Sequence, residues 1–167
     1  MNHPARKPVA ALAALLLAAC ALGPEKQETL SSDLIIASLS SAAAQAEASG
    51  DLRAAAAHYR TLFERAPQDM RIALKLARAM RLSGESRQAA AFLDQFTRGP
   101  KPGADLLIEI AKAYLSADQL PLALRYLNQA KPLAPDNWEV LSLLGVIRDY
   151  QGANAEARDL YDTALAL

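Results

Sequence analysis

The chain has 167 residues, and its 18 basic side chains balance its 18 acidic ones, so the formal net charge at pH 7 is zero. It contains one cysteine and two histidines. A single cysteine excludes an internal disulfide, and balanced charge gives no general attraction to nucleic acid. We therefore expect a fold that is held by packing alone and has no nucleic-acid partner.

The N-terminal residues predict a signal for export. Two basic residues precede the uncharged apolar run 9–22, which is shorter than the ~20 residues that a membrane-spanning helix needs. Residues 17–20, Leu-Ala-Ala-Cys, resemble the bacterial lipobox, in which the cysteine sulfur receives lipid and cleavage occurs just before it. The resemblance implies a lipoprotein signal peptide over 1–19 and lipidation of Cys20. A plain signal peptide with an incidental cysteine is the alternative.

The residues after the cysteine predict a location and a tether. Bacterial lipoproteins that stay in the inner membrane often carry Asp after the lipidated cysteine, and this chain has Ala21. The resemblance therefore implies the periplasmic face of the outer membrane. Residues 20–33 are polar and without an apolar period, which predicts a lipidated flexible tether. Residues 31–33, Ser-Ser-Asp, offer helix N-caps, so the folded domain is expected over 34–167.

The rest of the chain repeats with a period of 34 residues. The units are 36–69, 70–103, 104–137 and 138–167. Small residues recur at the eighth and twentieth positions of each unit, and turn-forming residues recur at the fifteenth. These columns are Ala43, Ala77, Ala111 and Gly145; Ala55, Ala89, Ala123 and Ala157; Gly50, Gly84, Asp118 and Gly152.

Each unit therefore predicts two antiparallel helices that approach closely at the small residues and are joined by a tight turn. The pattern resembles the tetratricopeptide repeat family over 36–167. The resemblance implies an all-α fold, a right-handed superhelix of about four helix–turn–helix repeats. One unit departs from the family, because Lys101 in the stretch "TRGPKPGAD" (97–105) replaces a proline that Pro67 and Pro135 supply in the first and third units. We expect an early helix end and a local change of superhelical pitch there.

No catalytic constellation accompanies the repeats. After signal removal the only histidine is His58, which is expected to be a partly exposed surface residue. The sequence has no Gly-rich phosphate loop and no Gly-x-Ser-x-Gly motif. We therefore predict a protein-binding scaffold rather than an enzyme, without a metal, a cofactor or a small-molecule substrate.

The resemblance implies that the first helix of each repeat lines a concave binding face. The groove would be basic in the second repeat, apolar in the middle and acidic in the fourth, and a merely solvated charged face is the alternative. Trp138 is expected to pack onto the preceding helix rather than to form an exposed platform. The expected groove residues are Arg71, Leu74, Lys75, Arg78, Arg81, Asp105, Ile108, Lys112, Leu115, Glu139, Ser142, Val146 and Asp149.

A narrower resemblance comes from "LLGVIRDYQGANAEARDLYDTALAL" (143–167) and "SGDLRAAAAHYRTLFERAPQD" (49–69). Both are similar to TadD-type lipoproteins of the tight-adherence (Flp) pilus system. The resemblance implies a pilotin that helps the secretin subunit to assemble in the outer membrane. A general envelope-assembly lipoprotein, such as a type IV pilus pilotin or a cell-wall enzyme adaptor, is the alternative. Leu160, Leu165 and Leu167 predict an apolar edge, which indicates either a docking surface or a truncated chain.

Overall fold

The computed structural model describes residues 24–99 and 101–167, and within them the chain forms helices and no strand. The chain divides into two compact units, Met1–Leu39 and Ser40–Leu167. The signal segment and Cys20 lie outside the described residues. The elements are α2 (Pro24–Ser49), α3 (Leu52–Arg65), α4 (Met70–Leu82), α5 (Ser86–Asp94), the 3₁₀ helix η1 (Gln95–Arg98), α6 (Ala104–Ser116), α7 (Leu120–Ala130), α8 (Trp138–Tyr150) and α9 (Asn154–Leu165).

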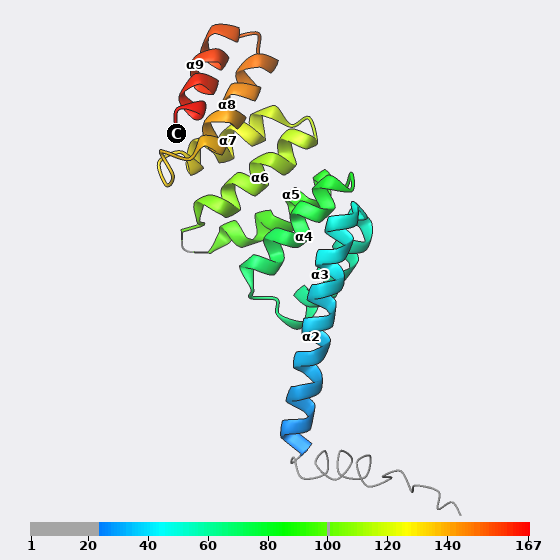
Figure 1. The fold of residues 1–167 in the computed structure, drawn as a ribbon. Helices are drawn as coiled ribbons and strands as arrows, with labels where there is room; N and C mark the ends of the chain where they lie inside the picture. The colour runs from blue at the N-terminus through cyan, green and yellow to red at the C-terminus, as the bar shows by residue number, and fades with distance from the viewer. Residues whose placement is uncertain (1–23, 100) are drawn as a thin grey trace, which may run out of the picture. The chain divides into compact units, whose positions relative to one another are not determined.

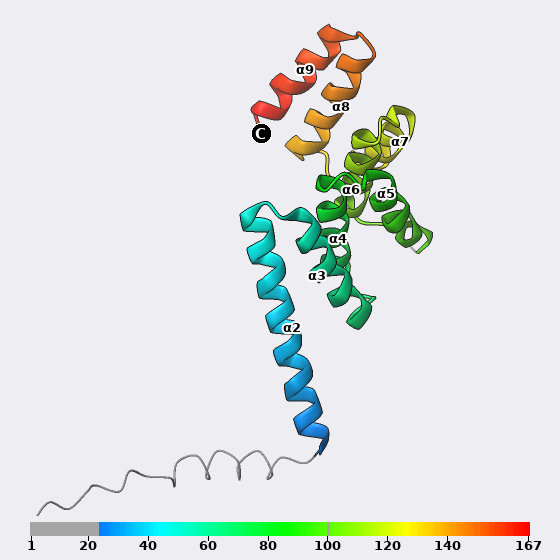
Figure 2. The ribbon, with the colours of Figure 1, turned by 90° about the vertical axis from the view of Figure 1, so that its right-hand side faces the viewer.

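The helices of the second unit follow one another as helical hairpins. Three of these hairpins are α4–α5, α6–α7 and α8–α9, and the members of each pack against one another. Figures 1 and 2 show α8 and α9 side by side in both views. The pairs begin at Met70, Ala104 and Trp138, the residues with which the predicted repeats begin. The predicted starts of the second, third and fourth repeats therefore coincide with the starts of helices, whereas the predicted start of the first repeat, residue 36, lies within α2.

The turn column has the backbone conformation that it predicts. Gly50, Gly84 and Gly152 have φ angles of 78°, 96° and 75°, and Asp118 has a φ of 57°. Glycine reaches this left-handed region without a Cβ penalty, and aspartate tolerates it better than most residues. Each hairpin therefore reverses at the same point of its repeat.

The two columns of small residues form the contact between paired helices. Seven of the eight are alanines with at most 1% of their surface exposed, and the eighth, Gly145, is also buried. Small side chains let two helix backbones approach closely, and larger residues fill the space around them. The largest fully buried side chains are Leu93, Leu107, Ile110, Leu127, Ile147 and Val140.

At Gly145 the neighbouring helix approaches so closely that no side chain would fit. A Cβ placed on it would lie 2.5 Å from Cε1 of Tyr161, well inside van der Waals contact. The Tyr161 hydroxyl donates to a carboxylate oxygen of Asp149 at 2.8 Å, which holds the ring over the glycine. In the α8–α9 pair the ring of Tyr161 therefore fills the space that a side chain at position 145 would occupy.

The stretch 94–103 departs from the repeat as the sequence predicts. The helix α5 has 9 residues, against 14 in α3 and 12 in α9, and it ends at Asp94 in a 3₁₀ turn. Phe96 of that turn packs edge-to-face on Phe63 and Phe92, with ring centroids 6.0 and 5.6 Å away. The early helix end is confirmed, whereas the change of superhelical pitch stays a prediction.

The start of the first described helix differs from the prediction. We expected an irregular tether up to Asp33 and a helix start near Ser31, but α2 begins at Pro24. The prediction was wrong for residues 24–33, because proline is well suited to the first turn of a helix and Glu25, Lys26 and Gln27 after it are good helix formers. Residues 20–23 lie outside the described part of the chain.

Candidate functional site

The first helices of repeats two, three and four enclose a cavity of about 240 Å³, which we call the central groove. Its lining comes from α4, α6 and the start of α8. All but one of its lining residues were among the predicted groove residues, Lys75 as a neighbour of the groove positions, and the exception is Glu109. The lining consists of Leu74, Lys75, Arg78, Asp105, Ile108, Glu109, Lys112 and Glu139.

Glu109 is the centre of a chain of ion pairs that crosses three helices. Its two carboxylate oxygens accept from Arg81 Nε at 2.8 Å and from Lys112 Nζ at 2.8 Å. Lys112 also reaches Glu139 at 3.1 Å. The side chains of Arg81 and Glu109 are only 13% and 8% exposed, so a single buried carboxylate links α4 to α6.

The predicted basic stripe of α4 therefore divides into three parts. Arg81 is paired with Glu109, and its guanidinium is not available to a partner. Arg71 is highly exposed and pairs with Asp69 at 2.9 Å. Lys75 and Arg78 are exposed and form no ion pair with the described residues, so they are the cations that the groove offers to a ligand.

The repeat pattern missed Glu109 because the family's groove positions do not include the sixth residue of a repeat. The available signal was the i, i+3 spacing of Glu109 and Lys112, which places opposite charges on one helical face. Lys75 holds the sixth position in the preceding repeat. Neighbouring first helices thus present opposite charges at equivalent positions.

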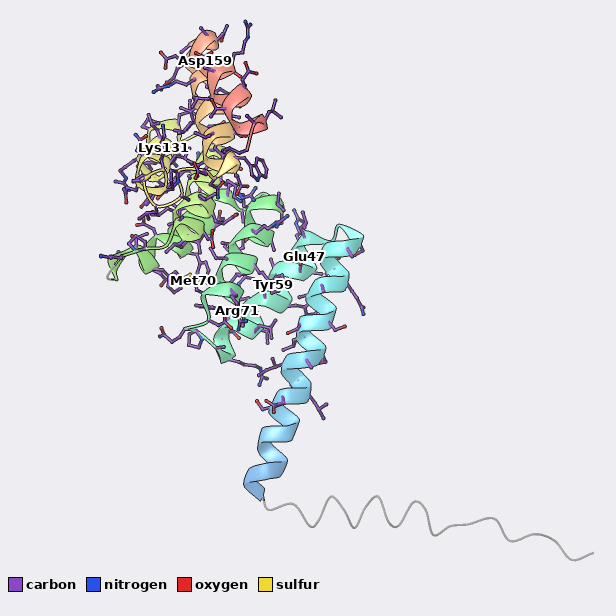
Figure 3. The ribbon with its side chains drawn as sticks, turned by 60° about the vertical axis from the view of Figure 1, so that its left-hand side comes forward. Glu47, Tyr59, Met70, Arg71, Lys131 and Asp159 are labelled. Carbon is purple, nitrogen blue, oxygen red and sulfur yellow. The ribbon has the colours of Figure 1, made fainter. Side chains whose placement is uncertain are left out.

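Tyr59 of α3 lies against the basic end of the groove. Its hydroxyl donates to Glu47 of α2 at 2.7 Å, and the ammonium of Lys75 lies 5.7 Å from its ring centroid. Figure 3 shows Tyr59 and Glu47 labelled on the neighbouring helices. Burial, followed by the hydrogen bond to Glu47, raises the pKa of Tyr59 to about 12, and the nearby Arg78 opposes this shift. Tyr59 is therefore a neutral wall beside Lys75 and Arg78 at physiological pH.

Six predicted groove residues do not line the central groove: Arg71, Arg81, Leu115, Ser142, Val146 and Asp149. Asp149 accepts the hydroxyl of Tyr161 and so serves the α8–α9 pair. Trp138 also differs from its prediction, since its surface is 60% exposed. Trp138 is the first residue of α8, and seven residues separate it from the end of α7 at Ala130.

A second cavity of about 340 Å³, which we call the side cavity, lies at the starts of α4 and α6. It shares Leu74 and Asp105 with the central groove. In Figure 3, Met70 and Arg71 are labelled where α4 begins. The lining consists of Met70, Arg71, Leu74, Phe96, Gly99, Lys101, Pro102, Gly103, Asp105 and Leu106.

None of the helices formed by residues 24–99 and 101–167 is long and apolar enough to cross a membrane. The same residues contain no group of three or more His, Cys, Asp or Glu side chains that could hold a metal ion. His58 is partly exposed on α3, as predicted.

Comparison with known proteins places the helical pattern in context. Residues 46–98 match the tetratricopeptide repeat family. An uncharacterized protein of Sinorhizobium fredii, y4yS, is 32% identical over 88 residues, which cover 53% of this chain and 48% of that protein. This chain therefore spans about half the length of that relative.

Solved structures show the fold. A crystal structure of the MamA protein superposes with a TM-score of 0.64 at 19% identity, over 79% of this chain and 72% of MamA. YrrB, described as a tetratricopeptide protein with an unusual peptide-binding site, superposes with a TM-score of 0.55 at 19% identity, over 73% of this chain and 63% of YrrB. The fold is thus the all-α tetratricopeptide helical repeat, an architecture that serves as a scaffold for protein–protein interaction.

Proposed function

We propose that the protein binds an extended segment of a client protein along the central groove. One observation carries the proposal: a single cavity is lined both by Lys75 and Arg78, two cations without an ion-pair partner among the described residues, and by the apolar Leu74 and Ile108. The apolar floor supplies affinity through burial, and the cations select an acidic or polar segment. The ion-pair chain through Glu109 holds the three helices in place before the client arrives, which lowers the ordering cost of binding.

The client proposed for this groove is a secretin subunit of a Flp-type pilus. Support comes from the resemblance of 49–69 and 143–167 to TadD-type lipoproteins and from the tetratricopeptide fold. Lipid on Cys20 would hold the scaffold at the outer membrane, where a secretin assembles. In this proposal the anchor supplies location and the groove supplies recognition.

The direct test of client binding uses overlapping synthetic peptides that tile the secretin subunit, titrated against the full-length protein in detergent. We expect one peptide to bind. The double variant Lys75→Glu/Arg78→Glu should reduce the affinity for that peptide at least tenfold at low salt. The matched control is Arg158→Glu, because Arg158 is exposed on α9 and lines neither cavity. Equal binding by the groove and control variants would reject the groove as the site.

The test in cells separates the anchor from the groove. We compare strains that carry Cys20→Ser, Lys75→Glu/Arg78→Glu or a deletion, and we measure heat-resistant secretin multimers in fractionated membranes. We expect the multimers to be lost in all three strains. The Cys20→Ser protein should still bind the peptide, whereas the groove variant should be lipidated and located normally. Normal multimers in the deletion strain would exclude the pilotin role.

A further inference from the structure

The side cavity is built by the stretch that breaks the repeat. Half of its lining residues surround the point where Lys101 replaces the usual proline: Gly99, Lys101, Pro102, Gly103 and Asp105. Because α5 ends at Asp94, the chain continues as a 3₁₀ turn that places Phe96 in the cavity wall. The expected groove residues Arg71, Leu74 and Asp105 supply only part of the lining, and the stretch that departs from the repeat supplies most of the rest.

The cavity suits one bulky apolar side chain. Met70, Leu74, Phe96, Pro102 and Leu106 supply its apolar wall. Its volume of about 340 Å³ leaves ample room for one bulky apolar side chain of an extended client segment.

The charges around the side cavity offset one another. Arg71 is already paired with Asp69, and Lys101 is accompanied in the lining by Asp105. A charged group entering this cavity would therefore lose its hydration without a net opposite charge to replace it. A neutral apolar side chain meets no such cost.

The side cavity and the central groove adjoin, because Leu74 and Asp105 line both of them. Along α4, Arg78 lies four to eight residues beyond the Met70–Leu74 wall of the side cavity. At ~1.5 Å per helical residue this is about 6–12 Å, the length of two to four residues of an extended chain at ~3.3 Å each.

We propose that the side cavity is a specificity pocket, which takes a bulky apolar residue of the client while an acidic residue two to four positions away lies over Lys75 and Arg78. The proposal rests on the proposed function and names the kind of segment that the groove selects. Shape in the side cavity and charge in the central groove then together distinguish this segment from a merely acidic one or a merely apolar one.

The experiment is a selection of random dodecapeptides displayed on phage, with the full-length protein in detergent as bait. We expect the enriched peptides to share Leu, Ile, Met or Phe at a spacing of two to four residues from Asp or Glu. The best peptide is then synthesised with its apolar residue changed to Ala, or its acidic residue changed to Asn or Gln. Each change should raise the dissociation constant at least tenfold in fluorescence anisotropy.

A filled cavity provides the matched test on the protein side. Gly103→Leu introduces a side chain where a Cβ meets no atom within 4 Å, so the fold should tolerate it. Gln129→Leu, on the exposed surface of α7 and outside both cavities, is the control. We expect Gly103→Leu to weaken binding of the parent peptide at least tenfold. It should not change the already weaker binding of the peptide whose apolar residue is replaced by Ala. Gln129→Leu should change the binding of neither peptide.

Three results would overturn the proposal in distinguishable ways. Enriched peptides that lack the apolar residue, or a parent peptide that binds Gly103→Leu normally, would reject the specificity pocket and leave the groove intact. If replacing the acidic residue of the peptide leaves its dissociation constant unchanged, Lys75 and Arg78 do not recognise an acidic residue of the client. Failure to enrich any peptide, together with no binding by the secretin peptides, would reject the proposed function itself. The peptide substitutions remain informative whether or not Gly103→Leu folds.

Discussion

The groove face and the α8–α9 pair are held together by different forces. Across the first helices, a buried carboxylate of Glu109 joins α4 to α6 through Arg81, and Lys112 extends the chain to α8 through Glu139. Within the fourth repeat, Gly145 lets the ring of Tyr161 lie on the backbone of α8. The first contact depends on the pairing of charges and the second on shape, although both lie within one helical architecture.

This difference separates what is common to the repeats from what is individual. Close packing at the eighth and twentieth positions recurs in every repeat and is independent of the ligand. The ion-pair chain occurs on the face where a client is proposed to bind, and it leaves Lys75 and Arg78 without a partner among the described residues. Substitutions in the two regions should therefore affect stability and binding in different proportions.

The largest effect is expected from Gly145→Leu, which breaks the packing side of the comparison. A Cβ would already lie 2.5 Å from the Tyr161 ring, and a leucine adds three further carbons. Overpacking of this kind costs roughly 1–3 kcal/mol in the free energy of unfolding. We expect about 3 kcal/mol, because the Tyr161 ring already lies against the backbone at Gly145. Thermal melts followed by circular dichroism measure the loss, with Ala153→Leu at the turn as the control. Equal losses in both variants would refute the packing role of Gly145.

A compensating variant sharpens the same point. The second and third repeats combine Ala77 with Leu93 and Ala111 with Leu127 at the positions of Gly145 and Tyr161. We expect Gly145→Ala/Tyr161→Leu to be more stable than Gly145→Ala alone, because the smaller side chain removes the close contact. If the double variant is the less stable of the two, the hydrogen bond from Tyr161 to Asp149 outweighs the steric term.

The second effect tests the charge side of the comparison through Glu109→Gln. The substitution keeps the volume of the side chain but leaves Arg81 and Lys112 without their buried carboxylate. Removing one partner of a buried ion pair costs up to ~3–5 kcal/mol, and the partial exposure of both cations reduces this to about 2 kcal/mol. Urea denaturation measures the change, with exposed Glu64→Gln as the control. A loss no greater than that of the control would show that the ion-pair chain does not stabilise the fold.

The third effect is expected from Tyr59→Phe, which removes one hydrogen bond and keeps the ring beside Lys75. The loss at neutral pH should be about 1 kcal/mol. The raised pKa of Tyr59 stabilises the folded state below the ordinary tyrosine pKa of ~10, and this stabilisation is lost as the pH rises through about 12. Tyr59→Phe should therefore lose less stability than the wild type between pH 10 and 12. The control is Tyr150→Phe, because Tyr150 is 66% exposed, and this variant should have the same stability as the wild type.

The fold could be predicted because its determinants repeat. Each boundary depends on small residues and turn residues at fixed positions, so one period specifies the starts at Met70, Ala104 and Trp138. The irregular stretch around Lys101 could be recognised as a departure from the pattern. The pattern does not specify the cavity that this departure creates, because the cavity depends on where Phe96 packs after α5 ends.

The site could be predicted only in part, because charge partners do not follow the repeat. Seven predicted positions meet in the central groove, but the period says nothing of the link between Arg81 and Glu109, which are 28 residues apart. The prediction that Trp138 packs onto the preceding helix was wrong for a related reason. Whether its indole is covered depends on the tertiary placement of the neighbouring segments, which the repeat period does not specify, and its surface is 60% exposed.

The smallest effect is expected from Arg71→Ala. This substitution removes an ion pair of arginine and a carboxylate like that of Arg81 and Glu109, but one that is exposed to solvent. The Arg71–Asp69 distance of 2.9 Å nearly equals the 2.8 Å between Arg81 and Glu109, but the side chain of Arg71 is 89% exposed. Solvent and salt screen such a pair, so the melting temperature at pH 7 should not change measurably. The hydrogen bond from the Arg71 side chain is the main cause that holds the pKa of Asp69 below its ordinary value. This stabilisation is present above the ordinary carboxyl pKa and is lost as the pH falls through the lowered pKa. The variant and the wild type should therefore have the same stability below the lowered pKa, and at pH 7 they should differ only by this small, screened contribution. A loss at pH 7 as large as that of Glu109→Gln would contradict the view that burial, rather than distance, decides what an ion pair contributes to this fold.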